Sequence, residues 1–147
     1  MARCGKSSER GRREECGVTK IVADSNIIIS LAFEDDSNHA RALRLWKDTD
    51  LAYLPVVAGL EVGYFLLKNG LPLKMLEEIL KDERIEVIDS TYADLAYAVS
   101  RKERVKSYDD LNDMLILGAC RRLSLKLMTF DGELERLSEP KRDEGRR

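Results

Sequence analysis

Four short apolar runs, separated by longer segments of helical periodicity, constrain the fold of this chain more than any other feature of its sequence. The runs cover residues 20–24, 51–54, 85–88 and 126–130, a length typical of buried strands. Helical segments are expected at 25–33, 38–48, 55–69, 72–81, 92–104, 108–122 and 132–137. Short apolar strands that alternate with helices are typical of a parallel sheet covered on both faces. We therefore expect an α/β fold with three layers, α/β/α, around a central parallel sheet of about four to five strands.

Local signals support several of these helix ends. Thr91 and Ser107 are each followed three residues later by an aspartate, Asp94 and Asp110, which is the pattern of an N-terminal capping pair. Pro55 suits the first turn of the helix after the second strand. These signals place Asp94 and Asp110 in ordinary capping roles.

Length and composition indicate one globular domain with charged tails. The chain has 147 residues, of which 44% are hydrophobic and 35% are charged. We expect a folded domain over residues 18–138, because residues 1–17 and 139–147 lack apolar periodicity and are expected to be flexible. No apolar run approaches the ~18–20 residues of a membrane span, and no secretory signal is evident. We therefore expect a cytoplasmic protein with no membrane partner.

Cysteine and charge usage narrow the functional classes. The three cysteines form no C-x-x-C pair, which argues against a zinc site or a disulfide framework, and Cys120 is expected in the core. Residues 18–138 hold sixteen basic and twenty-one acidic side chains. An acidic body attracts a phosphate substrate only through metal ions or local basic clusters. Such clusters occur at 41–44, 101–106 and 121–122, although a solvated helix face is the better explanation for any one of them.

Four carboxylates stand in or beside apolar segments. Asp24 and Asp131 directly follow the first and fourth predicted strands, so the same edge of the sheet would hold both if those strands are neighbours. Glu61 lies within the apolar helical stretch VVAGLEVGYFLL, and Asp113 lies past the first turn of a helix in NDMLILGAC. Burying a carboxylate is costly unless something offsets its charge. Together these four residues predict a site for divalent metal ions.

Neighbouring polar groups have more than one explanation. Ser25, Asn26 and Thr129 could orient metal-bound water from just outside the carboxylates. Glu61 could instead be a surface residue or part of a buried salt bridge. Asp110 could be an outer ligand, although helix capping is the better explanation.

The predicted chemistry is phosphodiester cleavage. Clustered oxygen ligands can hold two hard cations, one generating hydroxide and the other stabilising the leaving oxygen. A histidine acid–base pair is excluded because His39 is the only histidine, and it is expected to be an exposed residue at a helix start. The chain also lacks a phosphate-binding glycine loop and a serine-hydrolase elbow.

The segments VADSN, NDMLILGA and LMTFD, with a glutamate in the helix after the second strand, resemble those of the PIN-domain nucleases. The resemblance is strongest to the VapC-type toxin ribonucleases and covers residues 18–138. It implies a PIN-like fold, an RNA substrate, Mg²⁺ or Mn²⁺, a homodimer and a cognate antitoxin protein. It also implies that the acidic quartet is Asp24, Glu61, Asp113 and Asp131, supported by the hydroxyl of Ser25 or Thr129. The N-terminal extension of seventeen residues is unusual for the family.

The leading hypothesis is therefore a metal-dependent endoribonuclease, the toxin of a toxin–antitoxin pair. A ribosomal-RNA processing nuclease, or a catalytically silent domain that binds RNA or protein, remains open. A phosphatase with an aspartyl nucleophile is disfavoured, because Ser25 and Asn26 follow Asp24 where that class needs a second acid.

Overall fold

The structure is a computed structural model that describes residues 18–140. The predicted flexible segment at 1–17, and residues 141–147 of the predicted C-terminal tail, lie outside the described residues.

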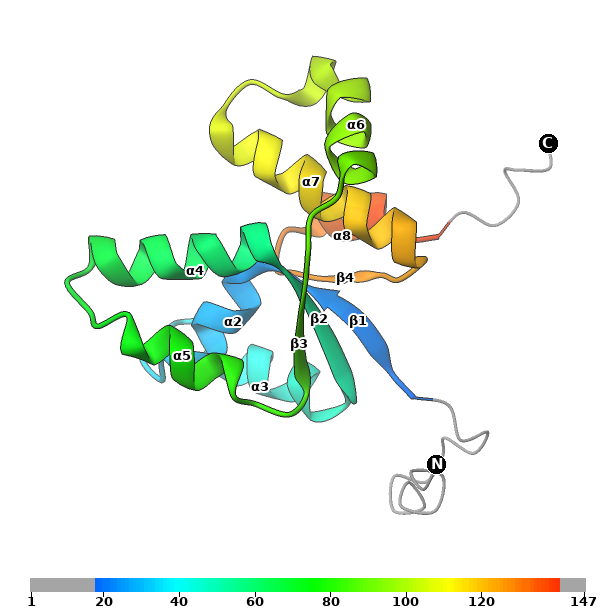
Figure 1. Ribbon diagram of the computed structural model, residues 1–147. Coiled ribbons are helices and arrows are strands. Elements are labelled where there is room, and N and C mark those ends of the chain that lie inside the picture. The colour runs from blue at the N-terminus through cyan, green and yellow to red at the C-terminus, as the bar shows by residue number, and fades with distance from the viewer. Residues whose placement is uncertain (1–17, 141–147) are drawn as a thin grey trace.

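The centre of the fold is a parallel sheet of four strands in the order β3-β2-β1-β4 (Figure 1). The strands are β1 (Lys20–Ala23), β2 (Leu51–Pro55), β3 (Ile85–Ile88) and β4 (Leu127–Met128). The chain moves outward from β1 to β2 and β3, and then returns across the sheet to place β4 beside β1. The predicted α/β class is confirmed, and so is the neighbourhood of the first and fourth strands on which the shared edge depended.

Helices cover both faces of this sheet (Figure 1). Within residues 18–140 they are α2 (Ser25–Ala32), α3 (His39–Lys47), α4 (Val56–Lys68), α5 (Lys74–Leu80), α6 (Tyr92–Ser100), the 3₁₀ turn η2 (Lys102–Arg104), α7 (Tyr108–Leu123) and α8 (Gly132–Ser138). Crossovers between parallel strands are right-handed, so the reversal of direction after β3 puts α6 and α7 on the face opposite α2 to α5. The result is the predicted three-layer arrangement.

Two predicted boundaries differ from the structure at the second and third crossovers. Pro55 is the last residue of β2 and pairs with Ile88, so it precedes α4 instead of forming its first turn. The helix predicted over 92–104 ends at Ser100, where the backbone NH of Arg101 donates to the carbonyl of Ala98, and η2 follows as a separate turn.

The fourth strand is shorter than the predicted run of 126–130. Its last ladder bond joins the NH of Asp24 to the carbonyl of Met128 at 3.1 Å. Beyond that bond the chain turns, because Thr129 bonds to Asp24 and Asp131 caps α8. This turn brings Thr129, the residue after β4, into contact with Asp24 at the end of β1.

The core lies between the sheet and its helices. Val22, Leu54 and Leu127 contribute from the strands, while Leu66 of α4 and Ile116 of α7 cover them from the two faces, and each is at most 1% exposed. Cys120 is also buried in this core, as predicted. Burial of these apolar surfaces fixes the strand ends relative to α4 and α7. Among residues 18–140, no helix has both the length and the apolar character of a membrane span.

Candidate active site at the carboxyl edge of the sheet

Asp24 is the most buried carboxylate at this edge, with only 5% of its surface exposed. It is the N-cap of α2: its Oδ1 accepts from the backbone NH of Ser25 at 2.8 Å. Its Oδ2 accepts from the hydroxyl of Thr129 at 2.7 Å. The first strand and the fourth strand together therefore fix this carboxylate in one orientation.

Thr129 and Asn26 link the ends of β1 and β4. The Asn26 amide donates to Thr129 Oγ1 at 3.3 Å, and the backbone NH of Phe130 donates to Asn26 Oδ1 at 3.4 Å. Thr129 Oγ1 also accepts from the backbone NH of Asp131 at 3.1 Å. The predicted supporting residues thus form one network that holds the two strand ends, and their carboxylates, side by side.

Asp131 lies at the exposed side of this edge and caps α8. Its Oδ1 accepts from the backbone NH groups of Glu133 and Leu134 at 3.1 and 3.2 Å. Both bonds use the same oxygen, so Oδ2 remains the oxygen with which Asp131 can contact a ligand.

Glu61 reaches the same edge from α4. Its Oε1 accepts from the hydroxyl of Ser25 at 2.9 Å, and its Oε2 accepts from the side-chain amide of Asn112 at 3.3 Å. Both donors are neutral, and no salt bridge of Glu61 occurs within residues 18–140. Within the described residues, hydrogen bonds from neutral groups and not a salt bridge therefore hold Glu61.

Asn112 is a site residue that the sequence reasoning missed. It is 6% exposed, and it lies on α7 one position before Asp113. A buried amide within an apolar helix needs a hydrogen-bond partner, and this requirement is the signal that could have identified it.

Asp113 differs from the other three carboxylates because it has no hydrogen bond or ion pair within the described part of the chain. It is half-buried on α7. Burial first, and then the charges of Asp24, Glu61, Asp131 and Asp110, raise its pKa from 3.8 to about 7. Half of the Asp113 carboxyl groups are therefore protonated near neutral pH.

The same electrostatics act on the other members of the group. Burial raises the pKa of Asp24, against the lowering effect of its bonds from Thr129 and Ser25, and the charge of Asp131 adds to the increase. Burial also raises the pKa of Glu61, with a further contribution from the charge of Asp24. Four carboxylates from four separate segments thus lie close enough to repel one another.

Asp110 has a local role. Its backbone NH donates to the Ser107 hydroxyl at 3.1 Å, and its Oδ2 accepts from the backbone NH of Lys106 at 2.9 Å. The capping explanation is confirmed. His39 lies at the start of α3 as predicted, although it is only half-exposed, and its Nδ1 lies 2.7 Å from the backbone carbonyl of Ser30.

The donor set fits a hard divalent cation by its chemistry. Carboxylate oxygens are the ligands that Mg²⁺ and Mn²⁺ prefer, and a cation would offset the repulsion that raises the Asp113 pKa. Within residues 18–140, no group of three acidic, histidine or cysteine side chains is already placed so that it could hold a metal ion. The carboxylates would therefore have to change their orientation to share an ion.

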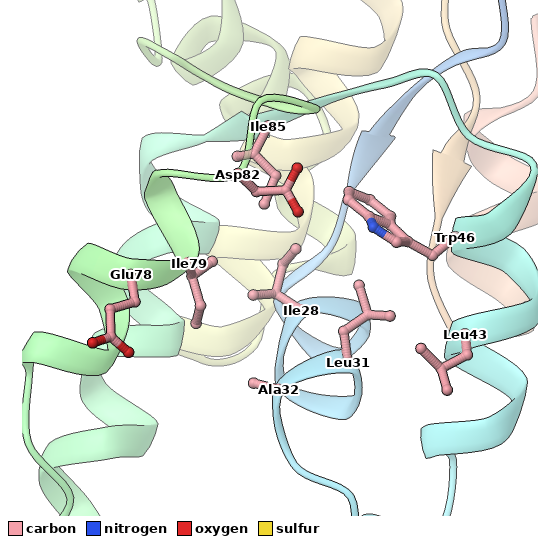
Figure 2. Close-up of a pocket in the computed structure, with 9 residues that line it drawn as sticks. All are labelled: Ile28, Leu31, Ala32, Leu43, Trp46, Glu78, Ile79, Asp82 and Ile85. Carbon is pink, nitrogen blue, oxygen red and sulfur yellow. The ribbon is translucent and has the colours of Figure 1, made fainter.

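A separate hollow of about 280 Å³ lies between α2, α3, α5 and β3 (Figure 2). Leu43 and Trp46 of α3 face Ile79 and Asp82 across it. None of the four carboxylates of the candidate site lines this hollow. The candidate active site and the apolar hollow are therefore at different places in the molecule.

Comparison with known proteins identifies the class. The PIN domain model matches residues 21–140, and the chain belongs to this family. The matched span contains all four carboxylates and every element of the sheet. No curated protein matches the sequence significantly.

Several solved structures share the fold. VapC20 of Mycobacterium tuberculosis, described as a toxin that cleaves the sarcin-ricin loop, is 19% identical, with a TM-score of 0.67 over 78% of this chain and 92% of VapC20. A toxin–antitoxin complex from Klebsiella pneumoniae is 21% identical, with a TM-score of 0.58 over 77% of this chain and 88% of that one. VapBC2 of Rickettsia felis, bound to a promoter DNA fragment, is 16% identical, with a TM-score of 0.57 over 81% and 93%. At these identities the likeness establishes the fold.

Proposed function

We propose that the protein is a metal-dependent endoribonuclease and the toxin of a toxin–antitoxin pair. The observation that carries this proposal is the convergence of Asp24, Glu61, Asp113 and Asp131 at one edge of a PIN-domain sheet. Nothing in the described chain neutralises Asp113, whose pKa is raised to about 7 by burial first and then by the surrounding carboxylates. An excess of negative charge in this position is the arrangement that a catalytic cation needs.

Some residues of this edge would hold the metal ion, and others would position the carboxylates that bind it. Asp113 and the Oδ2 of Asp131 would hold Mg²⁺ or Mn²⁺ together with Asp24 and Glu61. Thr129 keeps Asp24 in place, and Ser25 does the same for Glu61. The bound metal would supply an activated water and stabilise charge on the phosphate during in-line displacement.

RNA is the proposed substrate because the structural relatives include a toxin described as cleaving the sarcin-ricin loop. Ribosomal-RNA processing uses the same chemistry, and a map of the cleaved sites in cellular RNA distinguishes a growth-arresting toxin from a processing enzyme.

An antitoxin is the proposed protein partner, since two of the structural relatives are toxin–antitoxin assemblies. A basic side chain of that partner would occupy the acidic edge and block the metal ligands.

A homodimer is also proposed, through the exposed apolar side chains Leu60, Tyr64 and Leu67 on one face of α4, each at least 63% exposed. Light scattering of the chain alone, and after co-expression with the neighbouring gene product, tests both; a monomer that forms no complex would contradict them.

The activity is tested with full-length protein and single-stranded RNA in the presence of Mg²⁺ or Mn²⁺. We expect cleavage that a chelator abolishes and that Asp113→Ala or Asp24→Ala reduces by about a thousandfold or more, since the metal supplies several kcal/mol of charge stabilisation. Glu77→Gln removes one exposed acid on α5 and serves as the control.

Two results would contradict the proposal. Cutting that survives both aspartate substitutions would eliminate the carboxylate mechanism. RNA that is bound but never cut, with no metal uptake by calorimetry, would favour the catalytically silent binding domain.

A further inference from the structure

An arginine stacked on an aromatic ring flanks the acidic edge. The guanidinium carbon of Arg41 lies 4.8 Å from the centroid of the Phe130 ring. Arg41 is exposed in the first turn of α3, and Phe130 is the residue immediately before Asp131. This pair therefore joins a positive charge and an aromatic ring to the segment that carries a proposed metal ligand.

The hydrogen-bond network of the site fixes the backbone that carries this ring. The backbone NH of Phe130 donates to Asn26 Oδ1, and the residues on either side of it, Thr129 and Asp131, are hydrogen-bonded to each other. Thr129 in turn donates to Asp24. The backbone of Phe130 is thus held by the same network that holds Asp24 and the segment of Asp131.

The charge of Arg41 is available to a ligand. Within residues 18–140 Arg41 forms no ion pair, whereas Arg104 pairs with Glu133 and Arg122 pairs with Asp94. The Arg41 guanidinium lies over the Phe130 ring, and the side chain as a whole is exposed. An arginine plane supported in this way accepts an unpaired base on its outer face, while its NH groups still donate to phosphate.

We propose that Arg41, supported by Phe130, is a stacking platform for an unpaired base of the RNA substrate, next to the scissile phosphate. This inference rests on the proposed ribonuclease function and adds to it the requirement for a single-stranded nucleotide on the β4 side of the acidic edge. Stacking recognises the flat face that every base has. The platform therefore selects single-stranded over paired RNA and tolerates different sequences.

The test uses full-length protein carrying Asp113→Asn, so that RNA is bound without being cut, in Mg²⁺. The probe is a single-stranded RNA oligonucleotide containing 2-aminopurine, whose fluorescence is quenched by stacking. We expect Arg41→Ala to weaken binding by about five- to a hundredfold and to abolish part of the quenching. Arg41→Lys retains the charge without the planar group, so it should lose the quenching while keeping the salt dependence of binding.

Arg44→Ala is the matched control, because it removes the same charge from the exposed surface of the same helix. We expect it to weaken binding by no more than about twofold. Phe130→Leu keeps an apolar side chain but removes the ring. Because Phe130 is half-buried, thermal melting checks that this variant still folds.

The outcomes separate this inference from the function on which it rests. If the protein without substitutions cuts RNA, but Arg41→Ala binds as tightly as Arg44→Ala or retains full quenching, only the stacking platform is overturned. If the protein without substitutions neither binds nor cuts RNA, the proposed function is overturned together with the platform.

Discussion

Asp94 and Asp113 show how differently this fold treats the same side chain. Asp94 on α6 is 1% exposed, and Arg122 of α7 binds both of its oxygens at 3.0 and 2.8 Å. Asp113, also on α7, is half-buried and has no partner among residues 18–140. Burial acts to raise the pKa of Asp94, but the bonds from Arg122 and Thr91 outweigh it and lower the pKa, whereas the pKa of Asp113 rises to about 7.

The difference separates a structural carboxylate from one that is open to a ligand. Asp94 completes a capping box with Thr91 and ties α6 to α7 through its ion pair, so its charge is fully used. The charge of Asp113 is unused and is opposed by its neighbours. Strong pKa perturbation of this kind is typical of functional sites, and the following predictions test whether the two aspartates play these separate roles.

The largest effect is expected at the structural pair. Asp94→Asn leaves Arg122 without its counter-charge and weakens the cap of α6, and we expect the free energy of unfolding to fall by about 3 kcal/mol. Urea denaturation measures the change. Asp89→Asn is the control, because only the backbone carbonyl of Asp89 contacts Arg122. Equal stabilities of the two variants would remove the structural role of Asp94.

A smaller effect is expected where a neutral side chain supports the acidic edge. Asn112→Ala removes the bond to Glu61 Oε2 and leaves Glu61 less well oriented. We expect the affinity for Mn²⁺, measured by calorimetry, to fall by about ten- to a hundredfold. Restoration of metal binding by Asn112→Gln, which keeps the amide, would support this role, whereas an undiminished affinity in Asn112→Ala would show that the amide does not position Glu61.

The smallest effect is expected at Asp113, where removal of the carboxylate should increase the stability of the protein. In metal-free protein, the unfolded chain loses the Asp113 proton near pH 4 and the folded chain near pH 7, so stability falls as the pH rises through this window. Asp113→Asn should remove that slope and raise the free energy of unfolding at pH 7.5 by about 1 kcal/mol after solvent screening. Urea melts at several pH values measure it.

The reverse sign is expected for Asp94, since its lowered pKa gives stability that is present above pH 4 and is lost as the pH falls further. If Asp113→Asn destabilised the metal-free protein at pH 7.5, the carboxylate of Asp113 would have a structural partner and the contrast would fail. Added Mg²⁺ should stabilise the parent protein more than the variant.

The sequence was sufficient for the parts of the fold that depend on local pattern. Short apolar runs and capping residues located all four strands and the helices between them, because burial and capping act over a few neighbouring residues. The shared edge followed from strand direction, which carries Asp24 and Asp131 to the same side of the sheet. The β4 run was predicted too long, since Thr129 bonds across to Asp24 instead of continuing the ladder.

The contacts that the sequence could not supply join residues far apart in the chain. Asn112 meets Glu61 of α4, Arg122 meets Asp94, and Arg41 of α3 meets Phe130 after β4. Each pair depends on how two helices, or a helix and a strand, pack in three dimensions. The spacing of residues within one helix or strand does not show which residues of another element they will contact.

One helix connects the two regions compared above. Asp113 lies near the start of α7 and Arg122 near its end, roughly 13 Å apart along a single rigid rod. Gly118 lies between these two residues, and the Cβ of an alanine there would lie 2.9 Å from the Asp94 backbone. The helices α6 and α7 therefore pack in close contact at this position. A substitution near Arg122 should therefore misalign Asp113 at the other end of α7, and a screen for loss of the proposed activity should recover positions that lie far from the candidate site.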